Sequence, residues 1–337
     1  MKPAPILLGV LIALLSSAPV APLPAARADE AQLPGAGTAS TLVIHGPEET
    51  LRDFCVMQDG ALWLVLPGGT RHELVTSIAD PLIVNPGDGS FHPFEETQVR
   101  TALAALRHPL GAVRADVFLL PYPRRDGLES AAAPRLILLS PGVRPLSPEH
   151  QHAEFVHELG HVVQYARMPE VAVEEWEHYR ELRGITDVTV YNAWAAHANR
   201  PREIFAEDFR ALFGGALANY SGTVENATIA APASVTGLED FMRSVAGGAG
   251  TPDIPLACFP NPSSGAVSFF RSGGQAAALD LYDVAGRRVA TLRPAVSDGA
   301  FSWCWDGRDV TGAPVGTGTF FARARSGGAT LRVTRVR

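Results

Sequence analysis

The stretch EFVHELGHVVQY, residues 154–165, constrains the fold of this chain more than any other. Its apolar residues recur at helical spacing and form one stripe. Just upstream, Ser147 is a good N-cap residue and Pro148 suits the first helical position. The pattern therefore predicts an amphipathic helix over 148–167.

Two histidines lie on the face of this helix opposite its main apolar stripe. Because His157 and His161 are one turn apart, their imidazoles can bind one Zn²⁺ at about 2.0–2.1 Å. Glu158, next to the first histidine, can accept a proton from a water that the metal activates. This HExxH pattern predicts a zinc-dependent hydrolase that takes a third protein ligand from elsewhere in the chain.

The best source of the third ligand is the stretch NRPREIFAEDFRALFG, residues 199–214. On a helix that begins at Pro201, Glu203 and Glu207 share one face and the phenylalanines line the other. We expect Glu203 to bind the metal. Glu207, one turn on, would accept a hydrogen bond from a ligating histidine and fix its tautomer.

Other carboxylates fit less well. Glu181 has the separation from His161 that is typical of thermolysin-like enzymes, but the sequence around it lacks their signature. The metzincin pattern is excluded because a glycine and a third histidine do not follow His161 at the required spacing. The acidic cluster over 174–177 is interpreted as a solvated face.

HELGH followed by EIFAEDFR resembles the zincin metallopeptidases related to the catalytic domain of anthrax toxin lethal factor, whose pattern is H-E-x-G-H and then E-x-F-A-E-x-F. The resemblance implies an α+β zincin-like fold, with Glu203 as the third zinc ligand and Glu207 as its supporting glutamate. The tyrosine that the family has before the third ligand is missing here. Tyr191 and His197 are the two candidates for the group that stabilises the oxyanion.

The N-terminal residues 1–28 have the features of a secretory signal peptide, with an apolar run over 6–15 and an A-x-A cleavage site. That run is shorter than the ~20 residues of a membrane span, and we expect no transmembrane segment after its removal. Residues 29–39 are expected to form a flexible leader. A formal charge of −7 argues against nucleic acid as a partner.

Residues 40–245 are expected to form the catalytic domain. Its first half contains short strands, with a hairpin turn at Asp59-Gly60. The strand RLILLS, 135–140, directly precedes the metal-binding helix, and the resemblance to zincin enzymes implies that it is the sheet edge that pairs with an extended peptide substrate. Helices are predicted over 94–107, 148–167, 201–213 and 236–245.

A Gly/Pro stretch over 246–255 suits a linker, and residues 256–337 are typical of an all-β sandwich. This segment resembles the Ig-like domains of flagellar hook-capping proteins and of the C-terminal sorting domains of type IX secretion. The resemblance rests on Pro260, Asn261, Pro262, Leu281, Tyr282, Asp283, Gly286, Arg287, Trp305, Asp306, Gly307, Gly312, Val315 and Gly318. It implies sorting by bacterial secretion machinery or attachment to the cell surface, separable from catalysis.

The chain has three cysteines, an odd number. Cys258 and Cys304 either pair within the sandwich or are both small buried residues, and Cys55 belongs to the other domain. Asp306 and Asp309 are interpreted as turn residues in preference to calcium ligands.

Taken together, the motifs predict a secreted or cell-surface zinc metallopeptidase that acts on a peptide or protein substrate. The alternative is a catalytically idle zincin-fold surface protein that binds a protein or glycan partner. The presence of Glu158 favours the enzyme.

Overall fold

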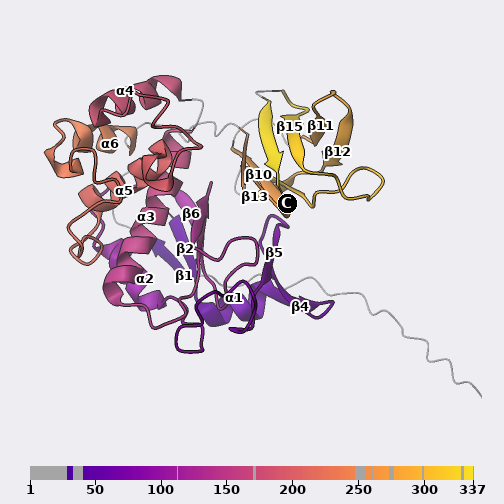
Figure 1. Ribbon diagram of the computed structural model, residues 1–337, viewed down its shortest axis with the longest axis horizontal. Coiled ribbons are helices and arrows are strands. Elements are labelled where there is room, and N and C mark those ends of the chain that lie inside the picture. The colour runs from indigo at the N-terminus through magenta and orange to yellow at the C-terminus, as the bar shows by residue number, and fades with distance from the viewer. Residues whose placement is uncertain are drawn as a thin grey trace, which may run out of the picture.

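The computed structural model describes residues 29–32, 41–111, 113–169, 172–246, 256–259, 261–272, 277–297, 300–327 and 330–336. Within these residues, a mixed α and β part is followed by an all-β part, which lies beside it (Figure 1). The expected signal peptide over 1–28, and the expected linker apart from Ala246, fall outside the described residues.

A five-stranded sheet forms the centre of the mixed part. Its strand order is β1 (Asp29–Gln32), β2 (Thr41–His45), β6 (Arg114–Leu119), β8 (Leu136–Leu139) and β7 (Ala131–Ala133). The inner strands β2, β6 and β8 are parallel, and β1 and β7 are antiparallel edge strands. All four residues of β8 are buried, as expected for a strand that is covered on both faces.

Two expectations about this sheet are wrong. The flexible leader predicted over 29–39 begins instead with the edge strand β1, which pairs with β2. The strand β8 is not the sheet edge, because β6 and β7 flank it on both sides. The edge strand is β7, whose short run of alanines carries no clear strand pattern.

Six α-helices are described: α1 (Pro47–Phe54), α2 (Glu96–Ala104), α3 (Pro148–Arg167), α4 (Val173–Arg183), α5 (Pro201–Phe213) and α6 (Leu238–Ala246). The helix α3 begins as predicted, because the Ser147 hydroxyl accepts a hydrogen bond from the His150 amide at 3.2 Å. The helices α1 and α4 were not predicted from the sequence. None of the helices in the described part of the chain is both long and apolar enough to cross a membrane.

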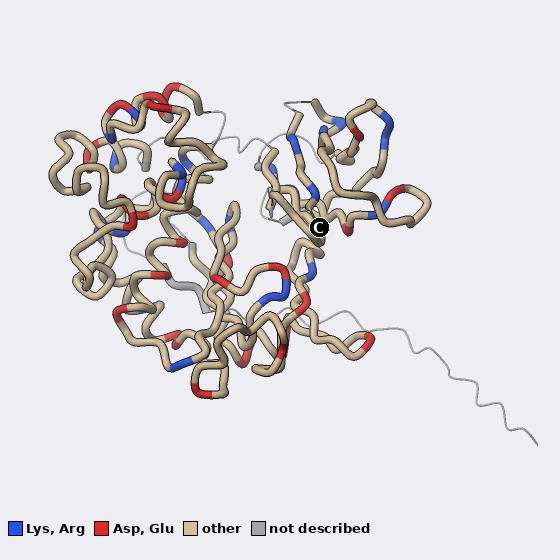
Figure 2. The backbone as a smooth tube through the Cα atoms, viewed as in Figure 1, with Lys and Arg blue, Asp and Glu red and all other residues tan. Residues whose placement is uncertain are grey.

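The helix α4 carries the acidic cluster. Its residues Glu174, Glu175 and Glu177 are exposed, and Figure 2 shows acidic residues grouped along this helix. Its apolar side faces the main core, where Tyr179 is fully buried. The prediction of a solvated acidic face is confirmed.

A separate three-stranded sheet consists of β3 (Cys55–Gln58), β4 (Ala61–Val65) and β5 (Arg71–Leu74). Asp59 and Gly60 connect its first two strands with positive φ angles of 52° and 80°. Two positive φ angles define the tight hairpin turn that an Asp-Gly pair favours. The predicted hairpin is therefore confirmed.

The described residues from 256 to 336, here called the C-terminal module, form two four-stranded antiparallel sheets. One has the order β13 (Ala295–Ser297), β14 (Ala300–Trp305), β10 (Val267–Ser272) and β9 (Ala257–Phe259). The other has the order β12 (Arg288–Leu292), β11 (Leu279–Asp283), β15 (Gly318–Ala324) and β16 (Leu331–Arg335). Phe269, Trp303 and Trp305 lie in the apolar core between the sheets, which confirms the all-β prediction.

The two cysteines of the module do not form a disulfide. Cys258 on β9 and Cys304 on β14 each pair across to β10, which lies between them. Two strand spacings of about 4.8 Å each are too wide for a disulfide. Asp309 is a turn residue, because its carboxylate accepts hydrogen bonds from the Thr311 and Ala313 amides at 2.8 and 3.1 Å.

Candidate metal centre

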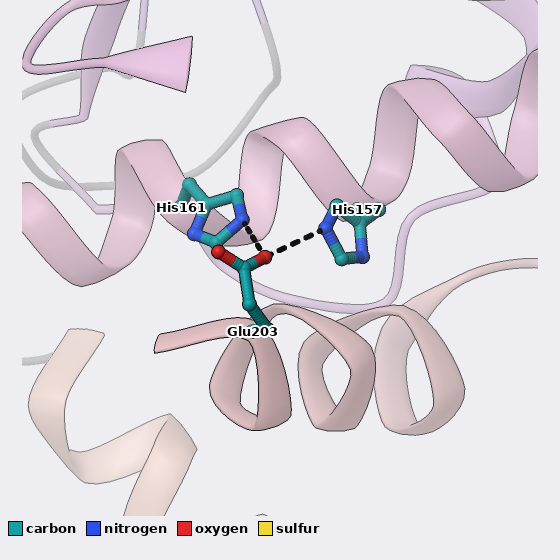
Figure 3. A group of neighbouring side chains, drawn as sticks. All are labelled: His157, His161 and Glu203. Atoms are coloured by element: carbon teal, nitrogen blue, oxygen red, sulfur yellow. Dashed lines mark hydrogen bonds and ion pairs between the residues drawn. The ribbon is translucent and has the colours of Figure 1, made fainter. Parts of the chain in front are cut away.

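The candidate site lies where α3 packs against α5. The contact is close because Gly160 of α3 has no side chain: a Cβ there would lie 2.9 Å from the Ala206 Cα. Figure 3 shows His157 and His161 on α3 pointing toward Glu203 on α5. The two predicted helices thus bring together the three predicted ligand residues.

The donor atoms of these three residues converge on one point. The Glu203 Oε2 atom lies 2.9 Å from His161 Nε2 and 3.5 Å from His157 Nε2. All three donor atoms lie within 4.8 Å of one another, and among the described residues no other group of this kind is found. Two imidazoles and one carboxylate are the donor set of one class of catalytic zinc site.

The separations between donor atoms also fit a metal. A tetrahedral Zn²⁺ with bonds of about 2.0–2.1 Å has ligand atoms about 3.3 Å apart. The two distances from Glu203 to the histidines, 2.9 and 3.5 Å, lie on either side of that value. The three residues therefore offer the donor types that zinc accepts, and two of their three separations lie near this value.

Glu207 holds the first histidine in place. Its Oε1 atom lies 2.9 Å from His157 Nδ1, so that ring nitrogen donates a proton and Nε2 is left facing Glu203. Arg210 donates two hydrogen bonds to the same carboxylate, at 3.0 and 2.8 Å, and the Glu225 amide donates a third at 3.0 Å. Glu207 thus makes the contact with His157 that the sequence predicted, and Arg210 holds its carboxylate in turn.

The buried groups of the site shift one another's pKa values. Burial opposes ionisation of Glu203, but hydrogen bonds from His157 and His161 outweigh it and hold the pKa of that carboxyl well below its usual range. Burial also opposes protonation of His157, yet its contacts with Glu203 and Glu207 raise its pKa to about 10. For His161 the burial effect dominates and the pKa is lowered.

Glu158 is buried beside the three ligand residues, with 7% of its surface exposed. Burial raises the pKa of its carboxyl to about 8; the charge of His157 works against this shift, and Glu154 and Glu203 add to it. With this pKa the carboxyl of Glu158 is largely protonated at neutral pH, and it could accept a proton only where added positive charge lowers the pKa.

The two candidates for the oxyanion group have different locations. His197, in the 3₁₀ turn His197–Asn199, has its Nε2 atom 3.4 Å from Glu203 Oε2. Its Nδ1 atom lies 2.8 Å from Glu225 Oε2, and its side chain is half exposed. Tyr191 packs against the main apolar core and does not line the cleft. The expectation for Tyr191 is therefore wrong.

Two further residues of the site were not expected in their roles. Glu225 orients His197 from a loop far along the chain, and no sequence pattern marks this pairing. Arg210 shares a helix face with Glu203 and Glu207, a spacing that could have identified it. Glu181 is exposed on α4 and is not part of the cleft or the donor group.

A cleft of about 770 Å³ opens onto His157, Glu158, His161 and Glu203. The edge strand β7 lines it with Ala131 and Ala132, and α3, α5 and the loop over 221–225 line other parts. This volume lies within the range of pockets that bind small ligands or short chain segments.

Behind the site, a buried ion pair fixes α5 against α4. Asp208 is fully buried, and its Oδ2 atom accepts a hydrogen bond from the Tyr179 hydroxyl at 2.7 Å and lies 2.7 Å from Arg183 Nε. Burial raises the pKa of Asp208 to about 7 against the opposing charge of Arg183. The orientation of α5 therefore depends on polar contacts as well as on the apolar core.

The fold and the site together define a mixed α and β protein with a His, His, Glu donor group and an all-β C-terminal module. No protein-family model matches the chain, and no curated protein matches it. One solved structure, the dimeric latent PorU from Porphyromonas gingivalis, is similar over 26% of this chain at 22% identity, with a TM-score of 0.20. The similar region spans 9% of that protein, and so low a score supports no inference about this chain.

Proposed function

We propose that this chain is a zinc-dependent metallopeptidase of zincin fold that hydrolyses peptide bonds. The observation that supports it is the convergence of His157, His161 and Glu203, with a buried Glu158 beside them. A His, His, Glu donor group with an adjacent carboxylate is what metal-assisted peptide hydrolysis requires.

When bound, Zn²⁺ would polarise the scissile carbonyl and lower the pKa of the attacking water. With the pKa of its carboxyl lowered by the charge of the bound ion, Glu158 would accept the proton of that water and then return it to the leaving amine. As an imidazolium, His197 would donate a hydrogen bond from Nδ1 to Glu225 and one from Nε2 to the carbonyl oxygen as negative charge develops there, and it keeps both protons.

The substrate is proposed to bind as an extended chain along β7. This strand pairs with β8 on one side only, so the groups on its other edge can pair with a peptide backbone. Its residues Ala131 and Ala132 line the cleft, and their small side chains leave space for a peptide backbone. Here β7 takes the role that the sequence assigned to 135–140.

The signal sequence and the resemblance of the C-terminal module support export, followed by secretion or surface attachment. The alternative remains an idle zincin-fold protein that binds a protein or glycan partner. The retention of Glu158 in a buried position beside the donor group favours the enzyme, because binding alone does not require a proton acceptor there.

The experiment that tests the proposal compares the wild-type protein with Glu158→Gln. Zinc content is measured by mass spectrometry, and cleavage of an unfolded protein is followed with and without a chelator. The variant should bind zinc normally and lose cleavage by several orders of magnitude, since Gln cannot accept the proton. A zinc-loaded wild type that cleaves nothing would support the idle alternative.

A further inference from the structure

The C-terminal module lines the same cleft as the donor group. Its residues Cys258, Phe259, Asn261 and Pro262 form part of the cleft wall. They belong to β9 and to the residues that follow it. From the sequence, this module is predicted to be separable from catalysis. Its position beside the site, however, gives it access to a bound substrate.

Close contacts hold the module against the three-stranded sheet. The hydroxyl of Thr70, next to β5, is hydrogen-bonded to that of Ser268 on β10, and both residues are buried. Gly68, in the turn before β5, lies against β14, since a Cβ there would be 2.9 Å from the Ser302 Oγ. The turn between β4 and β5 thus fits against the module without space for a further side chain at Gly68.

The module also has apolar and aromatic contacts with the first part of the chain. Phe259 and Phe270 pack against the apolar cluster that includes residues of β4, β6 and β8. On β16, the Arg332 guanidinium lies 5.5 Å from the centre of the Trp194 ring, within cation–π range. Trp194 precedes His197 in the chain, so the module contacts both the three-stranded sheet and the segment that leads to His197.

The wall that the module contributes is held firmly. The Asn261 side chain donates a hydrogen bond to the Arg332 carbonyl at 3.0 Å and accepts one from the Thr334 amide at 2.9 Å. Its amide group is thus committed within the module, and Pro262 beside it offers no backbone donor. These hydrogen bonds fix the position of Asn261 in the cleft wall.

Two sheet edges border the cleft. The strand β7 is the last strand of the central sheet, and β9 is the last strand of its own sheet. Residues of both strands line the cleft. A strand at a sheet edge can pair with an added extended chain, and a single extended chain fits a cleft of about 770 Å³ that is walled on two sides, whereas a folded domain is too wide for it.

We propose that the C-terminal module is the second wall of the substrate cleft, and that it restricts the enzyme to extended segments of unfolded polypeptide bound between β7 and β9. This inference rests on the proposed peptidase function and specifies its substrate class. The module is then a determinant of specificity as well as a device for export.

Hydrogen–deuterium exchange tests the binding mode without catalysis. The probe is a synthetic peptide spanning the bond that the wild-type protein cleaves fastest in reduced, alkylated ribonuclease. When this peptide is added to zinc-loaded Glu158→Gln protein, amides of both 131–133 and 257–259 should exchange more slowly. Protection of 131–133 alone would overturn the proposal and leave the peptidase function intact.

Cleavage of ribonuclease in its native and its unfolded form tests the restriction. Thr70→Arg should separate the module from the turn before β5, Phe259→Ala should trim the wall together with its apolar packing against the first part of the chain, and Thr70→Ser keeps the hydroxyl as a matched control. The first two variants should raise the rate on the folded form at least tenfold relative to the unfolded form, with zinc content unchanged. The control should keep the wild-type ratio.

If the cleavage rates of both forms of ribonuclease rise by the same factor, the variants release a general inhibition. If the ratio of the two rates is unchanged without such a rise, the module is no barrier to folded substrates. Either result overturns the proposal. If the wild-type protein cleaves neither form, the peptidase function fails. The exchange experiment would then use the unfolded ribonuclease itself as its probe, and unchanged exchange at 257–259 would overturn the second wall separately.

Discussion

Gly160 of α3 lies against the backbone of Ala206 on α5, with no room for a methyl group between them. A Cβ at Gly160 would be 2.9 Å from the Ala206 Cα and 3.1 Å from its carbonyl oxygen. The two small residues let the helices approach closely enough for Glu203 to reach His161 at 2.9 Å. The glycine of HELGH and the alanine of EIFAEDFR thus belong to the site although neither carries a functional group.

Gly160→Ala should therefore weaken zinc binding at least tenfold while the protein still folds. The added methyl must push α5 outward, at a cost of about 1–3 kcal/mol for an overpacked core. Zinc affinity is measured by competition with a chromogenic chelator. Gly316→Ala is the control, because a Cβ there meets nothing within 4 Å. Equal affinities for the two variants would contradict the role of the close contact.

Glu203→Ala should leave a folded protein with much weaker zinc affinity, because the carboxylate contacts both histidines and no other described residue joins the donor group. Glu181→Ala is the matched control, since Glu181 is exposed on α4. Zinc content after dialysis distinguishes them. Full occupancy in Glu203→Ala, with loss in Glu181→Ala, would show that the ligand assignment is wrong.

His197→Ala should lower kcat by about 10²–10³ and leave zinc content and KM nearly unchanged, as expected for a donor that acts in the transition state. Glu225→Gln should have a smaller effect on kcat, because it loosens the orientation of His197 without removing the ring. Steady-state kinetics on one peptide give both constants. Loss of zinc in His197→Ala would instead indicate that this residue is a ligand.

His108 should make the protein less stable in mild acid. It is buried and neutral: its Nδ1 atom accepts a hydrogen bond from the Leu110 amide at 3.1 Å, and its Nε2 atom lies 3.2 Å from the Met242 carbonyl oxygen. Burial lowers its pKa to about 4, and the charges of Arg243 and Arg167 add to this effect. Below pH 6.5 the unfolded chain therefore binds a proton that the folded chain excludes.

The stability that neutral His108 contributes is full above pH 6.5 and is lost as the pH falls toward 4, by up to about 3 kcal/mol. Urea unfolding of wild type and His108→Asn at pH 7, 5 and 4 measures this. The variant should be less stable at pH 7, and its deficit should shrink as the pH falls. A deficit that does not change with pH would refute the assignment.

Local sequence signals predicted much of the fold. The N-cap at Ser147, the turn at Asp59-Gly60 and the helical spacing of the apolar residues each depend on neighbours within a few positions. The helices α3 and α5 and the hairpin were found for this reason. The helices α1 and α4 were missed, since α1 buries only Thr50 and α4 buries only Tyr179 and Arg183, so neither carries a long apolar stripe.

The sequence by itself determined which residues present metal donors, because the i, i+4 spacing of His157 and His161 and the face shared by Glu203 and Glu207 are properties of single helices. Only the tertiary structure decided the rest: that β7 is the sheet edge, that Glu225 orients His197, and that the C-terminal module lines the cleft. Strand order and contacts between domains depend on packing between residues far apart in the chain, and no local pattern records them.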